Sequence, residues 1–349
     1  MTPEKTILVT GGAGFIGANA ALHFAETGWR VVILDNLSRK GSSLNLAWLK
    51  GIAPVEFRRV DIRDPLGVRT VVAEDRPSAV LHLAGQVAVT TSLIDPRADF
   101  EINALGTLNV LEAVRGEVPE ALVLYASTNK VFGRMDDVGV EERNGRYELR
   151  DLPEGVSENE RLDFHSPYGC SKGAADQYVL DYHKSFGLKT VVFRQSCIYG
   201  QRQLGVEDQG WVAWFLIAAV MGREINVYGD GKQIRDLLHV DDLIALYDTA
   251  IARPDLVAGK AYNVGGGPEN TLSINELLGV IRSEFGLQPE ISRGPWRVGD
   301  QPVFVTNIAK ASRELGWTPK VQCASGVKRL MCWIQDNRSL FEGIHGFPR

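Results

Sequence analysis

The sequence contains few cysteines and no apolar run long enough to span a membrane. The cysteines have no metal-ligand spacing and are too sparse for a disulfide scaffold; they stand at Cys170, Cys197, Cys323 and Cys332. The longest apolar run, Trp211 to Met221, is shorter than the roughly 20 residues of a transmembrane helix. We therefore expect no bound structural metal, no disulfide framework and no membrane span, and we expect a buried helix at Trp211.

The sequence also lacks an extended basic run and a signal-peptide pattern. A net charge of −5 disfavours nonspecific binding to nucleic acid. The strand-like stretch Ile7 to Val9 leads directly into glycines, unlike the apolar core of a signal peptide. With 349 residues, 44% apolar and 23% charged, the composition is that of an ordinary globular enzyme. We expect a cytoplasmic protein without nucleic-acid or membrane partners.

Strand-like and helix-like segments alternate through most of the first half of the chain. The strand-like segments are 6–10, 31–34, 55–60, 79–84, 121–126 and 190–194, and helical patterns cover 15–27, 100–114 and 168–186. Such alternation predicts an α/β fold, a doubly wound parallel Rossmann sheet with a ligand at the carboxyl ends of its strands. We expect a Rossmann domain over 1–198 and a smaller C-terminal α/β substrate lobe over 199–349, with 235–265 returning to the first domain and 135–163 forming a long surface excursion.

A glycine-rich turn follows the first expected strand. From Gly11 the sequence reads G-x-x-G-x-x-G through Gly14 and Gly17, and a helical pattern starts at Phe15. Glycines allow a tight turn, close approach of the backbone to a pyrophosphate, and close packing of helix on strand. Because strand, glycines and helix stand in this order, the segment predicts a dinucleotide site.

An acidic residue ends the second expected strand, where the adenosine ribose of a dinucleotide would lie. Asp35 follows Val31 to Leu34, and a carboxylate there repels a 2′-phosphate, which favours NAD over NADP. Ser38, Arg39 and Lys40 follow closely and could receive a phosphate. The sequence therefore predicts NAD as the cofactor while leaving an NADP-binding alternative open.

A tyrosine and a lysine stand one helical turn apart in the stretch Ser166 to Lys172. In a helix that starts near Pro167, Tyr168 and Lys172 share a face. A neighbouring cation lowers the pKa of a phenol, which is about 10 otherwise. Thr128 follows the expected strand 121–126 and would face the nicotinamide. We predict that Tyr168 takes the proton of a substrate hydroxyl, that Lys172 lowers its pKa and holds the nicotinamide ribose, and that Thr128 hydrogen-bonds the reacting oxygen. Alone, the Tyr–Lys pair would be better explained as two residues on an exposed helix.

These motifs together resemble the extended short-chain dehydrogenases/reductases, in the group of NAD-dependent nucleotide-sugar epimerases and dehydratases. The resemblance runs nearly end to end and includes Asp61-Ile62-Arg63-Asp64, His82-Leu83-Ala84-Gly85-Gln86, Asn103-x-x-Gly106-Thr107 and Arg235-Asp236-x-x-His239. It implies that NAD contacts Gly11, Gly14, Phe15, Ile16, Gly17, Asp35, Asn36, Ser38, Arg39, Asp61, Ile62, Leu83, Ala84, Gln86, Asn103, Tyr168, Lys172 and Gln195.

Within the family, the chain most resembles the branch that epimerises CDP-paratose to CDP-tyvelose at C2. The strings Ser127 to Val131, Asp163 to Tyr178 and Asp208 to Trp211 carry this resemblance. It implies oxidation of C2 to a ketone and return of hydride to the other face. It also implies that a nucleotide-diphosphate sugar, favoured to be a CDP-sugar, contacts Val87, Thr128, Asn129, His165, Cys197, Arg202, Arg235, Arg297 and Asp300.

Three other interpretations stay open. Dehydratases of the family carry an acidic pair directly after the strand-end threonine, where this chain has Asn129 and Lys130, so dehydration is disfavoured. A UDP-hexose 4-epimerase uses the same three catalytic groups, although many have Asn at the position of Cys197 and Tyr at that of Phe132. A noncatalytic dinucleotide-binding protein is the remote alternative. By the same resemblance the expected helices 100–114 and 168–186 pair across a two-fold axis, which predicts a homodimer or homotetramer.

Overall fold

The computed structural model describes residues 5–297 and 300–344, which divide into two compact units. The first unit comprises Met1–Val131, Phe164–Arg194 and Ile244–Tyr262, and the second comprises Phe132–Asp163, Gln195–Leu243 and Asn263–Arg349. The chain therefore passes between the units several times, whereas the expected boundary is a single one after 198 with one return. The excursion that begins near 135 belongs with the second unit.

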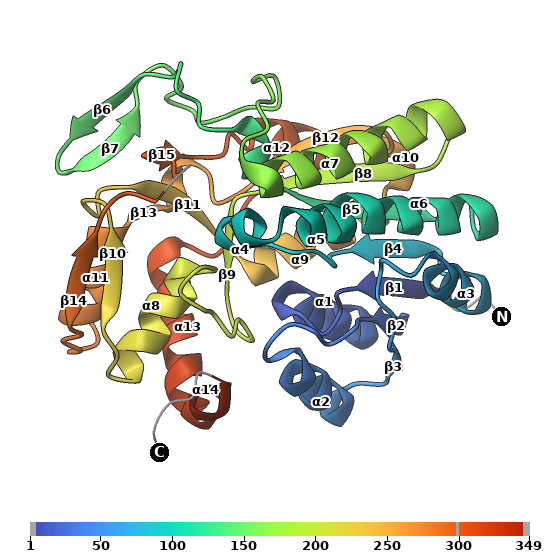
Figure 1. Cartoon of the computed structure of the whole chain (residues 1–349), viewed down its shortest axis with the longest axis horizontal. Helices are drawn as coiled ribbons and strands as arrows, with labels where there is room; N and C mark the ends of the chain where they lie inside the picture. The colour runs from blue at the N-terminus through green and yellow to red at the C-terminus, as the bar shows by residue number, and fades with distance from the viewer. Residues whose placement is uncertain (1–4, 298–299, 345–349) are drawn as a thin grey trace. The chain divides into compact units, whose positions relative to one another are not determined.

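The first unit is built on a seven-stranded sheet in the order β12-β8-β5-β4-β1-β2-β3 (Figure 1). The pairings of β1 with β2 and β4, of β2 with β3 and of β4 with β5 are parallel. The chain winds outward from β1 in one direction and then, from β4, in the other, which confirms the predicted doubly wound fold. The strands are β1 (Thr6–Thr10), β2 (Arg30–Leu34), β3 (Val55–Arg58), β4 (Ala79–His82), β5 (Leu122–Thr128), β8 (Thr190–Gln195) and β12 (Lys260–Val264).

Helices cover this sheet, and alternate strand residues supply its two apolar faces. Leu8, Val32 and Val80 belong to one buried cluster with apolar residues of α3, α6 and α7. The helices are α1 (Phe15–Glu26), α2 (Ser42–Ile52), α3 (Pro65–Asp75), α4 (Val89–Ile94), α5 (Pro96–Phe100), α6 (Gly106–Glu117), α7 (Ser166–Phe186), α9 (Val240–Ile251) and α10 (Pro254–Val257), with a π-helix η1 (Glu101–Leu105) and a 3-10 turn η2 (Asn129–Phe132). The expected single helix 100–114 is thus three consecutive elements, because the π-helical turn interrupts it.

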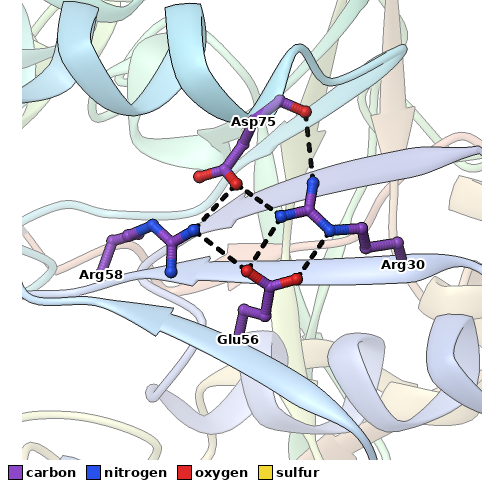
Figure 2. Close-up of polar contacts among 4 residues, drawn as sticks. All are labelled: Arg30, Glu56, Arg58 and Asp75. Atoms are coloured by element: carbon purple, nitrogen blue, oxygen red, sulfur yellow. Dashed lines mark hydrogen bonds and ion pairs between the residues drawn. The ribbon is translucent and has the colours of Figure 1, made fainter.

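A four-residue ion-pair network ties β2 and β3 to the end of α3 (Figure 2). Arg30 forms a fork on Glu56, with Nε to Oε1 at 2.6 Å and Nη2 to Oε2 at 2.9 Å. Arg30 and Arg58 both donate to Oδ1 of the buried Asp75, at 2.7 and 2.9 Å. Since both cations meet the buried carboxylate, the network holds the edge of the sheet to the helix that follows it, and it contains no residue predicted for the site.

The second unit has small sheets and a separate apolar core. Its strands are β6 (Val140–Arg143), β7 (Arg146–Leu149), β9 (Cys197–Tyr199), β10 (Ile225–Tyr228), β11 (Ile234–His239), β13 (Thr271–Ser273), β14 (Ile291–Gly294) and β15 (Val303–Phe304). Its helices are α8 (Trp211–Val220), η3 (Pro268–Asn270), α11 (Ile274–Ser283), α12 (Ala309–Leu315), α13 (Cys323–Asp336) and α14 (Arg338–Ile344). The apolar α8 is buried against α11 and α13, as its composition predicts. Among the described residues, no helix combines the length and apolarity needed to cross a bilayer.

Candidate active site

The glycine turn between β1 and α1 packs tightly enough that two of its glycines admit no side chain. Gly11 has φ +67°, and a Cβ on it would lie 2.7 Å from the backbone nitrogen of Ala84. A Cβ on Gly17 would lie 2.3 Å from the carbonyl oxygen of Gly11. The turn therefore presses against the end of β4 on one side and against the first turn of α1 on the other, and this places the start of α1 at the carboxyl edge of the sheet.

The start of α1 has the chemistry of an anion site. Gly14 is its N-cap, without a capping side chain, and the first turn contains no acidic residue. A Cβ on Gly14 would meet only the Gly11 carbonyl oxygen within 4 Å, at 3.1 Å, so the backbone there is open to an approaching group. β1 and β4 are where the winding of the sheet reverses, the place at which doubly wound folds bind ligands. These residues fit a dinucleotide pyrophosphate.

Asp35 links the glycine turn to the end of β2. Its carboxylate accepts hydrogen bonds from the backbone of Ala13 at 3.1 Å and of Leu37 at 2.8 Å. Burial raises the pKa of Asp35 above its usual value, and the two backbone donors oppose this. Asn36 donates to Asp61 at 2.8 Å, and the hydrogen bonds from Arg63 are the main cause that holds the pKa of Asp61 well below its usual range. The residues predicted to bind the adenosine end of NAD are thus neighbours, and the low pKa keeps Asp61 ionised at neutral pH.

Tyr168, Lys172 and Thr128 meet at the carboxyl end of β5. All three are buried, with exposures of 7%, 5% and 7%. Tyr168 and Lys172 lie one turn apart in α7, whose first turn contains Pro167, as predicted. The Lys172 Nζ donates to the Ala126 carbonyl at 2.6 Å and lies 4.3 Å from the centre of the Tyr125 ring. A Thr128 hydrogen bond acts on the Tyr168 phenol. The structure therefore brings the predicted proton-handling set together.

Without a cofactor, the pKa of the Tyr168 phenol is shifted in the direction opposite to the prediction. Burial raises the pKa of Tyr168 to about 12, and only the Thr128 hydrogen bond opposes it. Burial lowers the pKa of Lys172 to about 7, against the attraction of Asp176 and Asp99. The expected lowering of the Tyr168 pKa by Lys172 is absent here. Burial raises the pKa of the phenol and lowers that of Lys172, which leaves the lysine only partly charged near neutral pH.

A buried carboxylate that the sequence analysis did not single out lies behind this pair. Asp99, 1% exposed, accepts from the Ser171 hydroxyl at 2.5 Å, from the Gln86 amide at 2.8 Å and from the Asn103 amide at 3.2 Å. Asn103 also donates to Ser171 at 3.1 Å and accepts from the Gln86 backbone at 2.9 Å. The carboxylate thus holds the side chains of two residues predicted for the cofactor. The sequence signal for Asp99 was its position four residues before Asn103, which places the two on one helix face.

A second buried acid ties the catalytic helix to two strands. Asp176, fully buried, forms a fork with Arg194 on β8, with both N–O distances at 3.0 Å. It also accepts from the hydroxyl of Ser127 on β5 at 2.8 Å. Asp176 stands four residues after Lys172, on the same helix face. The ion pair therefore fixes the orientation of α7, which carries Tyr168 and Lys172.

The other residues predicted for the cofactor lie where the strands end, with varying burial. Ile62 and Asn103 are buried, and a Cβ on Gly106 would meet Ile62 at 2.6 Å. Partly buried positions are Phe15, Ile16, Leu83, Ala84 and Gln86, whereas Ser38 and Arg39 are exposed. Gln195 is buried at the end of β8. Ser38 and Arg39 are therefore the most exposed of these predicted NAD contacts.

In the second unit, three of the predicted substrate residues form one cluster. Arg235 donates to Asp300 at 2.6 Å, and the Asp300 backbone donates to the Arg297 carbonyl at 3.2 Å. The Arg297 guanidinium lies 4.1 Å from the centre of the Tyr228 ring and 3.2 Å from Asp208. Two arginines and two acids thus lie close together where the resemblance predicts the diphosphate and ribose of the substrate.

The remaining predicted substrate residues are more scattered. Arg202 is 8% exposed and lies over the ring of Trp333, 5.6 Å from its centre, and not in the cluster of Arg235. Cys197 begins β9 and is partly buried, and Val87 is partly buried after β4. His165 is the exposed N-cap of α7 and provides no capping hydrogen bond.

The residues directly after Thr128 are not acids. Asn129 is 8% exposed and its Oδ1 accepts from the Thr128 hydroxyl at 3.3 Å. The Lys130 backbone donates to the Thr128 oxygen at 3.2 Å. The site thus has the buried phenol of Tyr168 for proton transfer and no carboxylic acid at these two positions for eliminating water.

Known proteins similar to this chain include NAD-dependent enzymes that act on nucleotide sugars. The family model described as "NAD dependent epimerase/dehydratase family" matches residues 7–265. A CDP-paratose 2-epimerase of Salmonella typhi is 45% identical over 94% of this chain and 98% of that protein. A Thermus thermophilus UDP-glucose 4-epimerase in complex with NAD is 32% identical, with a TM-score of 0.79, over 95% of this chain and 99% of that one.

A Streptomyces venezuelae dTDP-glucose 4,6-dehydratase with NAD bound has a TM-score of 0.83 at 27% identity, over 97% of this chain and 99% of that one. Both solved structures thus span nearly the whole of this chain and were determined with NAD. Together with the glycine turn, the Tyr–Lys pair and the doubly wound sheet, these matches place the chain in the NAD-dependent epimerase/dehydratase family.

Proposed function

We propose that the protein is an NAD-dependent epimerase that inverts C2 of a CDP-sugar, converting CDP-paratose to CDP-tyvelose through a transient 2-ketone. The observation that carries the proposal is the buried set of Thr128, Tyr168 and Lys172 beside a dinucleotide turn, in a chain 45% identical to a CDP-paratose 2-epimerase. The absence of a carboxylic acid at Asn129 and Lys130 supports epimerisation over dehydration.

In this proposal the protein's own residues manage one proton. Tyr168 takes the proton of the C2 hydroxyl and returns it after inversion, while Thr128 hydrogen-bonds the same oxygen. NAD, when bound, supplies reversible hydride transfer at C2. The Tyr168 pKa of about 12 in the protein alone is too high for a base near neutral pH. A charged Lys172, and the positive charge of an oxidised nicotinamide, would both lower it.

The glycine turn and the residues around it would hold the cofactor. Gly11, Gly14 and Gly17 leave the start of α1 open to the pyrophosphate, and Asp35 would accept from the adenosine ribose. Lys172 would hold the nicotinamide ribose. The other proposed contacts are Phe15, Ile16, Asn36, Ser38, Arg39, Asp61, Ile62, Leu83, Ala84, Gln86, Asn103, Tyr168 and Gln195.

We assign the substrate diphosphate to Arg235 and Arg297 and its ribose to Asp300, because the fork of an arginine suits phosphate geometry. The remaining proposed substrate contacts are Val87, Thr128, Asn129, His165, Cys197 and Arg202. The proximity of Arg235, Asp300 and Arg297 supports the first assignment. Arg202 is the least supported, since it lies on Trp333.

We also propose a homodimer, or a homotetramer built from it. Large apolar side chains are exposed on α4, α5, η1 and α7, an unfavourable arrangement for an isolated chain: Leu93 51%, Ile94 85%, Phe100 55%, Leu105 39%, Tyr178 50% and Phe186 51%. These elements include the helices expected to pair across a two-fold axis. Light scattering should give at least a dimer at micromolar concentration, and a monomer would contradict the proposal.

A UDP-hexose 4-epimerase is the second candidate, favoured by the 32% identical UDP-glucose 4-epimerase. The two candidates differ in the carbon that inverts. Purified protein, incubated without added NAD with CDP-paratose or with UDP-glucose, should invert C2 of the first and leave C4 of the second unchanged, as followed by NMR. Inversion of UDP-glucose alone would select the 4-epimerase. Inversion of neither would support a noncatalytic dinucleotide-binding protein.

A further inference from the structure

Next to Arg297, the second unit contains a polar cluster organised around one carboxylate. The Glu207 Oε1 accepts from the Asn226 amide at 2.9 Å and from the Tyr228 hydroxyl at 3.0 Å. Asn226 and Tyr228 belong to β10, and Ser292 of the neighbouring strand β14 donates to the Asn226 Oδ1. Glu207 lies in the loop before α8, and side chains of the two strands hold it in place.

The donors of this cluster are turned toward its own acceptors. The phenol proton of Tyr228 and an amide proton of Asn226 point at the same Glu207 oxygen, and the Ser292 proton points at Asn226. Among the described residues, no donor contacts the other Glu207 oxygen, Oε2. Glu207 is partly exposed, so Oε2 is available to a ligand. A carboxylate oxygen can only accept, and a ligand group that meets it must therefore be a donor.

Cationic and aromatic groups adjoin this acceptor. The Arg297 guanidinium lies 4.1 Å from the centre of the Tyr228 ring, the same residue whose hydroxyl donates to Glu207. The arginine is only 29% exposed and is paired with Asp208 at 3.2 Å. The preceding residue, Trp296, is 41% exposed. A ligand beside these groups meets a cation, aromatic surface and a carboxylate, a combination that suits a nucleotide with an amino group on its base.

We infer that Glu207 reads the base of the nucleotide by accepting a hydrogen bond from its exocyclic amine, and so selects cytidine over uridine and thymidine substrates. Cytosine presents an amine at N4, whereas uracil and thymine present the oxygen O4 at the same position. An oxygen facing the Glu207 carboxylate would be repelled and would leave a desolvated charge without a donor. This inference rests on the proposed function, in which the substrate is a nucleotide-activated sugar.

Isothermal titration with CDP and UDP tests the inference directly. The wild-type protein should bind CDP about 10- to 100-fold more tightly than UDP, the discrimination expected of one well-placed contact between a base edge and a charged group. In Glu207→Gln the side-chain amide can both accept and donate, so the ratio should fall to within about 3-fold of unity. Asp208→Asn is the matched control, since it removes the same charge one residue away and should change both affinities in parallel.

The outcomes separate this inference from the proposed function. Equal binding of CDP and UDP by the wild-type protein, which needs no variant to fold, would overturn the inference and leave the epimerase assignment standing. A CDP preference that survives Glu207→Gln would also overturn it. Selective binding of CDP without epimerisation of CDP-paratose would support the base-reading role and contradict the proposed reaction. If neither nucleotide binds the wild-type protein, both proposals fail.

Discussion

Replacing Asp99 by asparagine removes one buried negative charge behind the Tyr168–Lys172 pair and keeps its shape. The amide oxygen can accept from Gln86 and Asn103 as the carboxylate does, and the amide nitrogen can donate to Ser171. The Ser171 hydroxyl can then donate to the Tyr168 carbonyl, which already lies 3.2 Å away. The substitution therefore changes charge with little change in packing.

The expected effect is a shift in the pH dependence of catalysis. Asp99 raises the pKa values of both Lys172 and Tyr168. Its charge therefore favours the protonated form of the pair, whether the proton is lost from Lys172 or from Tyr168. A charge close to a titrating group shifts its pKa by about 1 to 3 units. Because Asp99 is one of two carboxylates that act on Lys172, we expect its removal to move the pH dependence by about one unit.

The assay is the pH profile of kcat/KM for the CDP-sugar, whose acid limb reports the proton lost from this pair. In Asp99→Asn the limb should move to lower pH by about one unit. Asp95→Asn is the control, because it makes the same change at an exposed helix cap, where solvent screens the charge and asparagine caps equally well. An acid limb that stays in place, or moves to higher pH, would refute the electrostatic role of Asp99.

Four further variants test other parts of the site. Tyr168→Phe should lower kcat by at least about 100-fold while the protein still binds NAD, as measured by turnover and cofactor content; full turnover would remove the phenol from the mechanism. Gly14→Ala should weaken NAD binding by at least about 10-fold, because its Cβ would stand at the start of α1. Gly17→Ala should lower Tm more than Gly14→Ala does, since its Cβ would lie 2.3 Å from the Gly11 carbonyl oxygen and that of Gly14 would lie 3.1 Å from it. Equal NAD affinity in Gly14→Ala and the wild-type protein would contradict the pyrophosphate assignment. Asp176→Asn should destabilise the fold by about 3 to 5 kcal/mol in denaturant unfolding, because Arg194 stays buried without its ion pair, and a change below about 1 kcal/mol would contradict that.

The predictable part of the fold is the part fixed by local pattern. The strand before Gly11, the turn itself and the start of α7 at Pro167 follow from apolar runs, glycine spacing and proline, and each lies within a residue or two of its expected place. The π-helical turn Glu101–Leu105 did not follow, because a change of helical hydrogen bonding leaves the apolar spacing nearly intact.

The site was predictable only where residue type alone carries the chemistry. Tyr168, Lys172 and Thr128 have a recognisable spacing, and the structure places them together. Asp99 did not stand out, because its spacing of four residues from Asn103 indicates only a shared helix face, whereas its role depends on how α5 packs against α7. The sign of the Tyr168 pKa shift was wrong for the protein alone for a related reason: the cost of burial depends on the surrounding chain.

The hydrogen at C2 of the sugar tests the account most directly. CDP-paratose carrying deuterium at C2 is incubated in ordinary water with the purified protein and no added cofactor. Hydride transfer to bound NAD and back predicts that the CDP-tyvelose formed keeps its deuterium at C2. Loss of the deuterium to solvent during inversion would show that C2 is deprotonated, and would contradict the oxidation and return of hydride on which the proposed mechanism depends.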